Sequence, residues 1–269
     1  MADTPTFHGV DFSGAARPGD DIWLATVADG RVTACRSARE AFDATGRDDV
    51  LGALREWLAT ADGPVGLDFS FGLPRALLPP LDDWPAFLAW FRDEFADADG
   101  RTMQTRLKDR ARAGATDGVE LKRATDGPVG ASSPYSFITR YQTLHGVRDV
   151  LAPLVLDGRA GVEPLAPADG PTLCEIYPAS ALRALDLPDE RYKGGAHAGE
   201  RARRERIVAG LREHVRLDDA TADLLVAEGG GDALDAVVAA LTVSRVAEAG
   251  FAVDADRYDP LEGYIYTPR

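Results

Sequence analysis

Two aspartates stand in short apolar segments of the N-terminal half of the chain. Asp11 ends the apolar part of HGVDFSG, and Asp68 lies inside VGLDFSFG. A carboxylate in an apolar strand is costly unless it is paired, protonated or bound to a metal ion. For Asp11 the ordinary alternative is a turn-capping role, because Ser13-Gly14 follows it. The apolar neighbours on both sides of Asp68 argue against that alternative there.

A second pair of acids lies near the C-terminus, in GGGDALDAVV. Asp232 and Asp235 are three residues apart, so on a helix their side chains share one face. Both would also suit a first helical turn, where the helix dipole favours acids and Asp232 can cap the helix. Glu228 precedes Asp232 by one turn and joins the same face if the helix begins early.

Glu175 is a further carboxylate in an apolar segment, TLCEIYP. Side chains alternate along a strand, so an outward orientation of Glu175 toward solvent is the alternative, and it stays open. Ligand sites in parallel sheets lie at the carboxyl ends of the strands. We therefore expect Asp11, Asp68 and Glu175 to lie near one edge of a sheet.

Carboxylates gathered at one point repel one another, which raises some of their pKa values unless a cation lies between them. Hard cations such as Mg²⁺ or Mn²⁺ take oxygen ligands. Two such ions about 3.5–4 Å apart can activate a water and stabilise the leaving oxygen of a phosphodiester. The acids therefore predict a two-metal site, in which Asp11 and Asp68 hold one ion and Asp232 with Asp235 holds the second or orients the water.

The composition limits the classes of protein and of partner. The 269 residues are 45% hydrophobic, enough for a sizeable core. No apolar stretch approaches the roughly 20 residues that span a bilayer, and no signal-peptide pattern is visible, so we expect a cytoplasmic protein. The net charge of −14 and the scarcity of lysine suggest an acidic, salt-adapted surface. They also count against a broad basic surface for nucleic acid, less so at high salt, where phosphate attraction is screened.

The elements that must position these acids are predicted by hydrophobic pattern and turn signals. Expected strands cover 7–12, 21–27, 31–35, 65–74 and 172–177, and the main expected helices cover 48–58 and 232–249. The order predicts an α/β fold with a mixed sheet of the RNase H-like kind, in which three antiparallel strands are followed by parallel ones and helices flank the sheet. Residues 82–157 read as a mostly helical insertion after the fourth strand, within a single domain over 1–269. Pattern alone leaves other α/β sheets open.

Several motifs together resemble the domain-of-unknown-function family 429. They are GVDFSG, GLDFSFGLP, CEIYPAS, LDLP, YKG, GGDALDAVVAALTVSRVAEAG and EGYIYTP, in that order. The family is regarded as predicted nucleases of the RNase H-like superfamily. The resemblance implies a site like that of RuvC-type resolvases, with acids at Asp11, Asp68, Asp232 and Asp235. Position 68 holds Asp where resolvases usually hold Glu, and Glu175 has no resolvase counterpart.

The resemblance implies a nuclease, so nucleic acid is the expected partner. Ser13 and Ser70 are candidate donors near the site, although solvated turns would explain both. Basic residues of the insertion are candidate substrate contacts: Arg106, Lys108, Arg110 and Arg123. A second basic run covers 201–206. Arginines among acids on a helix commonly form a solvated salt-bridge face, so this alternative remains. The resolvase likeness also suggests a homodimer, although nothing in the sequence marks a self-complementary surface.

Two other functions stay open. One is a non-catalytic RNase H-like scaffold or binding protein, for which the shorter Asp68 is an argument. The other is an actin-like phosphotransferase or nucleotide hydrolase. The chain is short for two such domains and has no P-loop or GxGxxG motif, which counts against it.

Overall fold

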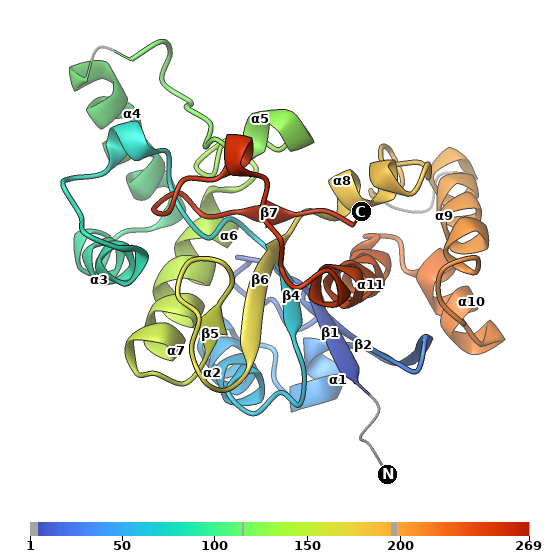
Figure 1. Cartoon of the computed structure of the whole chain (residues 1–269). Helices are drawn as coiled ribbons and strands as arrows, with labels where there is room; N and C mark the ends of the chain where they lie inside the picture. Colours follow the sequence, from blue (N-terminus) through green and yellow to red (C-terminus); the bar gives the residue numbers. More distant parts are fainter. Residues whose placement is uncertain (1–4, 115, 195–197, 269) are drawn as a thin grey trace.

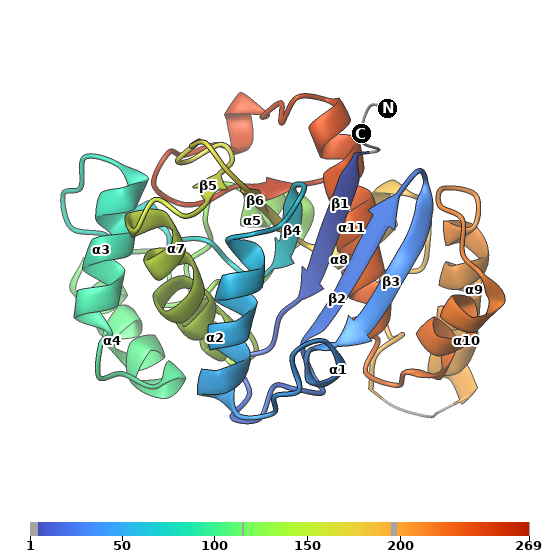
Figure 2. The ribbon, with the colours of Figure 1, turned by 90° about the horizontal axis from the view of Figure 1, so that it is seen from below.

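The computed structural model describes residues 5–114, 116–194 and 198–268. A mixed sheet forms its centre, with strands in the order β3-β2-β1-β4-β6-β5 and with β7 also paired to β6. The first three strands are antiparallel and the others are parallel. Helices lie on both sides of this sheet (Figures 1 and 2). The predicted fold class is therefore confirmed.

The antiparallel part comprises β1 (Thr6–Asp11), β2 (Trp23–Ala28) and β3 (Arg31–Ser37). A two-residue turn joins β2 to β3. Its residues, Asp29 and Gly30, both have positive φ angles, 49° and 63°. Such a turn matches the twist of a hairpin, and aspartate and glycine tolerate it. The expected strands 21–27 and 31–35 thus form a hairpin.

The chain then crosses through α1 (Ala38–Phe42) and α2 (Arg47–Leu58) to reach β4 (Val65–Asp68). Strand β4 pairs with β1 in parallel, as a helical crossover permits. It ends at Asp68, six residues before the end of the expected strand. Asp68 consequently stands at the carboxyl end of β4, where sequence analysis had placed it inside the strand.

The remaining strands complete the parallel edge. Strand β6 (Thr172–Ile176) pairs with β4, and the short strands β5 (Gly161–Val162) and β7 (Ile265–Tyr266) both pair with β6. Sequence analysis did not predict β5 and β7, since two residues are too few to show a periodic pattern. The C-terminal segment docks on the body of the protein through β7.

The long helix α11 (Asp232–Glu248) covers one face of the sheet and crosses β1, β2 and β4 (Figure 2). It lies very close to the strands. A Cβ atom added to Gly9 would lie 2.1 Å from the carbonyl oxygen of Ala236, and one added to Gly66 would lie 3.0 Å from that of Ala239. Gly9 and Gly66 are register partners on β1 and β4, so together they form a shallow seat for the helix backbone.

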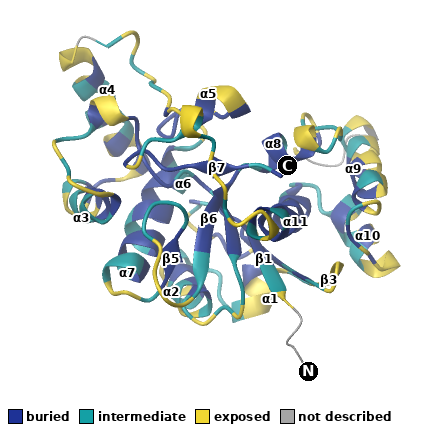
Figure 3. Ribbon diagram, in the orientation of Figure 1, coloured by how far each residue is buried: buried dark blue, intermediate teal, exposed yellow. Residues whose placement is uncertain are grey.

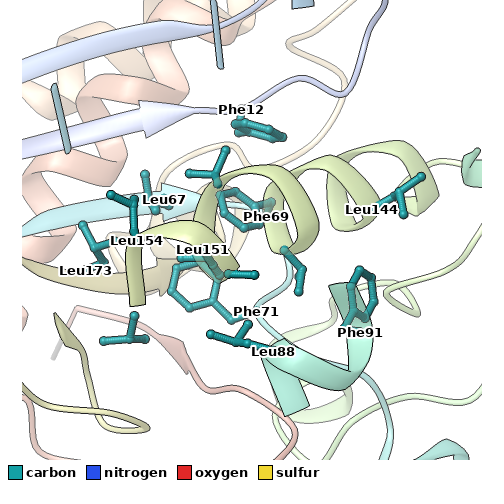
Figure 4. Close-up of a cluster of buried hydrophobic side chains, with 14 of the residues drawn as sticks. Phe12, Leu67, Phe69, Phe71, Leu88, Phe91, Leu144, Leu151, Leu154 and Leu173 are labelled. Atoms are coloured by element: carbon teal, nitrogen blue, oxygen red, sulfur yellow. The ribbon is translucent and has the colours of Figure 1, made fainter. Parts of the chain in front are cut away.

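The other face carries α2 and the helices that follow β4. These are η1 (Arg75–Leu77), α3 (Trp84–Glu94), α4 (Gly100–Ala113), α5 (Asp126–Val129), α6 (Arg140–His145), the π-helical η2 (Gly146–Leu151) and α7 (Ala152–Leu156). Their apolar side chains meet those of the strands in one large cluster (Figure 4). Gly146 lies against the ring of Phe69, and a Cβ there would come within 2.3 Å of it. Residues 82–157 are thus mostly helical, and their treatment as an insertion within one domain remains a prediction.

Three shorter helices complete the α11 side: α8 (Pro178–Ala184), α9 (Ala198–Leu211) and α10 (Asp219–Ala227). A 3-10 turn, η3 (Ala255–Arg257), leads to β7. The strands are largely buried and the outer faces of the helices are exposed (Figure 3). In the described part of the chain, no helix combines the length and the apolar character needed to cross a bilayer.

A carboxylate cluster at the ends of beta1 and beta4

Asp11 and Asp68 are register partners at the carboxyl ends of β1 and β4. Each follows, two positions later, the glycine that seats α11. Side chains alternate along a strand, so both carboxylates point to the face that α11 covers. The buried Asp11 and the half-buried Asp68 therefore meet the first turn of that helix.

The first turn of α11 carries Asp232 and Asp235. One carboxylate oxygen each of Asp11, Asp68 and Asp235 lies within 4.8 Å of the others. Three elements distant in the sequence thus contribute to one point. Asp232 lies at the margin of this cluster and is more exposed than Asp11 and Asp235. We call these four residues the carboxylate cluster.

Lys193 reaches into the carboxylate cluster from the loop between α8 and α9. Its Nζ lies 3.7 Å from Oδ1 of Asp11 and 3.6 Å from Oδ1 of Asp232, and it forms a close ion pair with Oδ2 of Asp235. The side chain remains 43% exposed. Sequence analysis did not assign it a role, although it stands in the quoted YKG motif.

The residues around Lys193 fix its position. The Tyr192 hydroxyl donates a 2.8 Å hydrogen bond to Oδ1 of Asp235. The buried guanidinium of Arg204 donates to the carbonyl oxygens of Tyr192, at 2.6 Å, and of Val226, at 3.0 Å. Arg204 belongs to the basic run considered for nucleic acid, and the structure instead places it beneath the loop that carries Lys193.

The glycine-rich segment before α11 brings the helix against the same loop. Gly231 has a φ of 79°, and a Cβ there would lie 2.9 Å from Cγ of Lys193. Glu228 turns back and accepts hydrogen bonds from the backbone N–H groups of Asp232, at 2.7 Å, and Ala233, at 3.3 Å. Because α11 begins at Asp232, Glu228 caps the helix and does not join its acidic face.

Burial and mutual repulsion shift the pKa values of the carboxylate cluster upward. Burial is the largest cause in each case and is opposed by Lys193. The pKa of Asp68 rises to about 7 and that of Asp232 to about 6, and the pKa values of Asp11 and Asp235 rise as well. Burial lowers the pKa of Lys193, but Asp11 and Asp235 outweigh it and raise that pKa well above its usual value. The ionised carboxylates are therefore disfavoured, and an additional positive charge nearby would stabilise them.

Glu175 lies outside the carboxylate cluster. It pairs in register with Leu67, one residue before Asp68, so its side chain points to the opposite face of the sheet. There it forms a bidentate pair with the fully buried Arg123, which also binds Asp126 at 2.7 Å. Both side chains are thus engaged within the protein. Both residues also line the pocket that Asp68 borders, so the catalytic role of Glu175 and the substrate-binding role of Arg123 stay predictions.

The other predicted substrate contacts, which all lie on α4, form pairs or hydrogen bonds within the protein. Lys108 pairs with Glu120 at 2.6 Å, Arg110 pairs with Glu94 at 2.8 Å, and Arg106 donates to the carbonyl oxygen of Glu94 at 2.7 Å. Helix α4, which carries all three, lies on the side of the molecule away from α9 and α10 (Figure 1). These contacts match the alternative of a salt-bridged helix face.

The two serines remain near the site. The Ser13 hydroxyl accepts a 3.2 Å hydrogen bond from the backbone of Ala15, as in a turn. Ser70 lines a pocket of about 290 Å³, whose wall also includes Asp68 and Lys193. Ser70 therefore faces the space beside the carboxylate cluster.

The same pocket has an apolar rim. Ile138 lines it, and both Ile138 and its neighbour Phe137 are exposed, by 75% and 74%. The guanidinium carbon of the buried Arg140 lies 4.3 Å from the centre of the Phe137 ring and supports it from beneath. Other aromatic side chains of this segment, such as Trp84 and Tyr135, are buried in the core.

Comparison with known proteins gives one family match. The model of the family described as "Protein of unknown function (DUF429)" matches residues 9–255. No curated protein and no solved structure matches the chain.

Proposed function

The chain belongs to the DUF429 family, and from the geometry of its carboxylate cluster we propose that it is a divalent-metal-dependent nuclease, a phosphodiester hydrolase acting on nucleic acid. One observation carries the proposal: carboxylate oxygens of Asp11, Asp68 and Asp235 lie within 4.8 Å of one another. They come from two parallel strand ends and the helix that crosses them, and one of them, Asp68, borders a pocket.

The chemistry of the cluster fits a hard cation. Every candidate ligand atom is a carboxylate oxygen, which Mg²⁺ and Mn²⁺ prefer. The raised pKa values of Asp11, Asp68 and Asp235 are those of buried acids short of positive charge. When bound, a divalent ion lowers the pKa of a coordinated water and stabilises charge on a phosphoryl oxygen.

The protein's own residues would hold and orient the reactants. Asp11, Asp68 and Asp235 are the proposed ligands, and Asp232 at the margin can accept a hydrogen bond from an approaching water. Ser70 can donate to a phosphate oxygen in the pocket. A base of a single-stranded or opened nucleic acid can stack on the exposed ring of Phe137. A cytoplasmic location is part of this proposal.

Calorimetric titration with Mn²⁺ tests the metal site. Saturable binding to the wild type that Asp11→Asn and Asp235→Asn each weaken at least tenfold would support it. Asp219→Asn is the matched control, because that side chain is 97% exposed and pairs with Arg212 at the surface. Proteins that bind Mn²⁺ are then incubated with single- and double-stranded DNA and RNA, with and without chelator. A folded wild type that binds no Mn²⁺ rejects the proposal.

A second candidate function is a non-catalytic RNase H-like scaffold. The observation in its favour is the ammonium of Lys193, which already lies against three of the carboxylates. If that ammonium alone compensated the negative charge of the carboxylates, the site would need no metal ion. The titration separates the two candidates, since a scaffold of this kind binds no Mn²⁺ at the cluster.

A further inference from the structure

We propose that Lys193 takes the place of a second metal ion. The carboxylate cluster then accepts one divalent cation, held by Asp11, Asp68 and Asp235, while the ammonium of Lys193 occupies the α11 side of the cluster, against Asp232 and Asp235. The inference rests on the proposed function for the single ion. It replaces the two-ion site expected from the acids alone with a site of one ion and one resident ammonium.

The first argument is the position of Nζ. It contacts carboxylates of both acids on α11 and lies 3.7 Å from Asp11. A second ion shared between β1 and α11 would need the same oxygens. Two cations at this range repel each other strongly, and the buried setting weakens screening by solvent. The ammonium therefore excludes an ion from the α11 side and leaves the Asp11–Asp68 side open.

The second argument is that the protein builds a support for this lysine. The backbone of Tyr192 is held by Arg204, and its hydroxyl is held by Asp235. Gly231 adopts a positive φ and leaves room for the Lys193 stem, which a Cβ would crowd at 2.9 Å. A surface lysine that merely bends toward acids would not need a buried arginine, a buried tyrosine and a left-handed glycine around it.

The third argument concerns the pocket. Lys193 lines it together with Asp68 and Ser70, so the ammonium faces the space where a phosphate would lie beside the bound ion. A fixed positive charge there stabilises negative charge that develops on phosphoryl oxygens. In two-metal sites the second ion stabilises this negative charge. Lys193 would thus act as a positioning and charge-stabilising residue.

The test counts ions. Mn²⁺ is titrated by calorimetry into the wild type, Lys193→Met, Lys193→Arg and the control Lys122→Met, which removes an exposed lysine. We expect one ion per chain in the wild type, Lys193→Arg and Lys122→Met, and two in Lys193→Met. Electron paramagnetic resonance gives a second readout, because two neighbouring Mn²⁺ ions produce a spin-coupled spectrum. We expect that spectrum only for Lys193→Met.

Each other outcome is decisive. Two ions, or a coupled spectrum, in the wild type would overturn the inference and leave the proposed function intact. One ion in a folded Lys193→Met protein would also overturn it, since the lysine would then exclude nothing. Absence of binding in every protein would instead reject the proposed function. If Lys193→Met fails to fold, the wild-type spectrum and the Lys193→Arg stoichiometry still decide.

Discussion

The rings of Phe12 and Phe69 lie 4.7 Å apart, on the face of the sheet opposite to the carboxylates of Asp11 and Asp68. Asp is the last residue of both strands and Phe-Ser follows it in each case, so each strand end turns an acid toward α11 and a ring toward the helical segment that follows β4. The two rings pack against each other and Phe69 also packs against Gly146, which fixes the two strand ends. The acids are thereby held side by side as register partners.

Gly9→Ala should destabilise the protein severely. The new methyl group would lie 2.1 Å from a backbone oxygen of α11, so the helix must move away from β1. Overpacking of this kind typically costs about 1–3 kcal/mol and sometimes more. Gly52→Ala is the control, because its Cβ has 3.9 Å to its nearest neighbour within α2 and alanine favours a helix by about 1 kcal/mol. Urea unfolding should show opposite signs for the two, and equal stabilities would contradict the close approach of α11.

Arg123→Met should cost about 3–5 kcal/mol of unfolding free energy, since it strands the buried Glu175 and Asp126 without their partner. Arg159→Met is the matched control, because that arginine pairs with Glu56 at the surface. Exposed pairs contribute about 1 kcal/mol or less. Thermal and urea unfolding measure both. A small loss for Arg123→Met would show that the two carboxyls are protonated or hydrated in the folded protein.

Without divalent metal, Asp68 should make the protein less stable as the pH rises from about 4 to 7. Burial raises the folded-state pKa of Asp68 to about 7, so over this range the folded chain keeps a proton that the unfolded chain has lost. Stability then falls with rising pH, by at most about 1.4 kcal/mol per pH unit from this group. Asp68→Asn should lose this dependence, so its unfolding free energy should rise relative to that of the wild type as the pH rises. Urea unfolding in chelator at several pH values measures it, with Asp219→Asn as the control. Parallel curves of unfolding free energy against pH for wild type and Asp68→Asn would refute the raised pKa of Asp68.

Phe137→Ser should weaken binding of single-stranded nucleic acid at least fivefold and leave stability unchanged. The ring is exposed and its sequence neighbour Ile138 lines the pocket. Stacking of one base contributes about 1–3 kcal/mol. Fluorescence anisotropy of a labelled oligonucleotide, with Ca²⁺ in place of Mg²⁺ to slow cleavage, reports the affinity. Val253→Ser is the control, since Val253 is also exposed but lies in the segment before β7. Equal affinities for wild type and Phe137→Ser would remove Phe137 from the substrate surface.

Asp11, Asp68 and Asp235 could be identified as site candidates because an acid among apolar strand or helix residues can be recognised in the sequence alone. Their common face follows from strand alternation once β1 and β4 are neighbours. The order of elements predicted a mixed sheet that allows this pairing, among other α/β sheets. The same reasoning left the face of Glu175 open, because its register against Leu67 depends on where β6 pairs with β4. One residue of register reverses the face of a side chain.

Lys193 and Arg204 could not be assigned from the sequence. Lys193 lies in a loop with no periodic pattern, and its partners are 39 to 182 positions away. Arg204 lies in a charged helix whose composition is typical of a solvated face, yet it is buried. The triple glycine before Asp232 was the one available sign that another segment comes close there.

The cap formed by Glu228 has a consequence for ligand recognition. The amide groups that a helix start normally offers to a phosphate are, at Asp232 and Ala233, already taken by a carboxylate of the protein itself. An incoming nucleotide would meet a negative charge at this end of α11. These two amides are therefore not free to bind a phosphate as the helix start of a P-loop protein does, and the positive charge for a phosphate at this site has to come from a side chain or a metal ion.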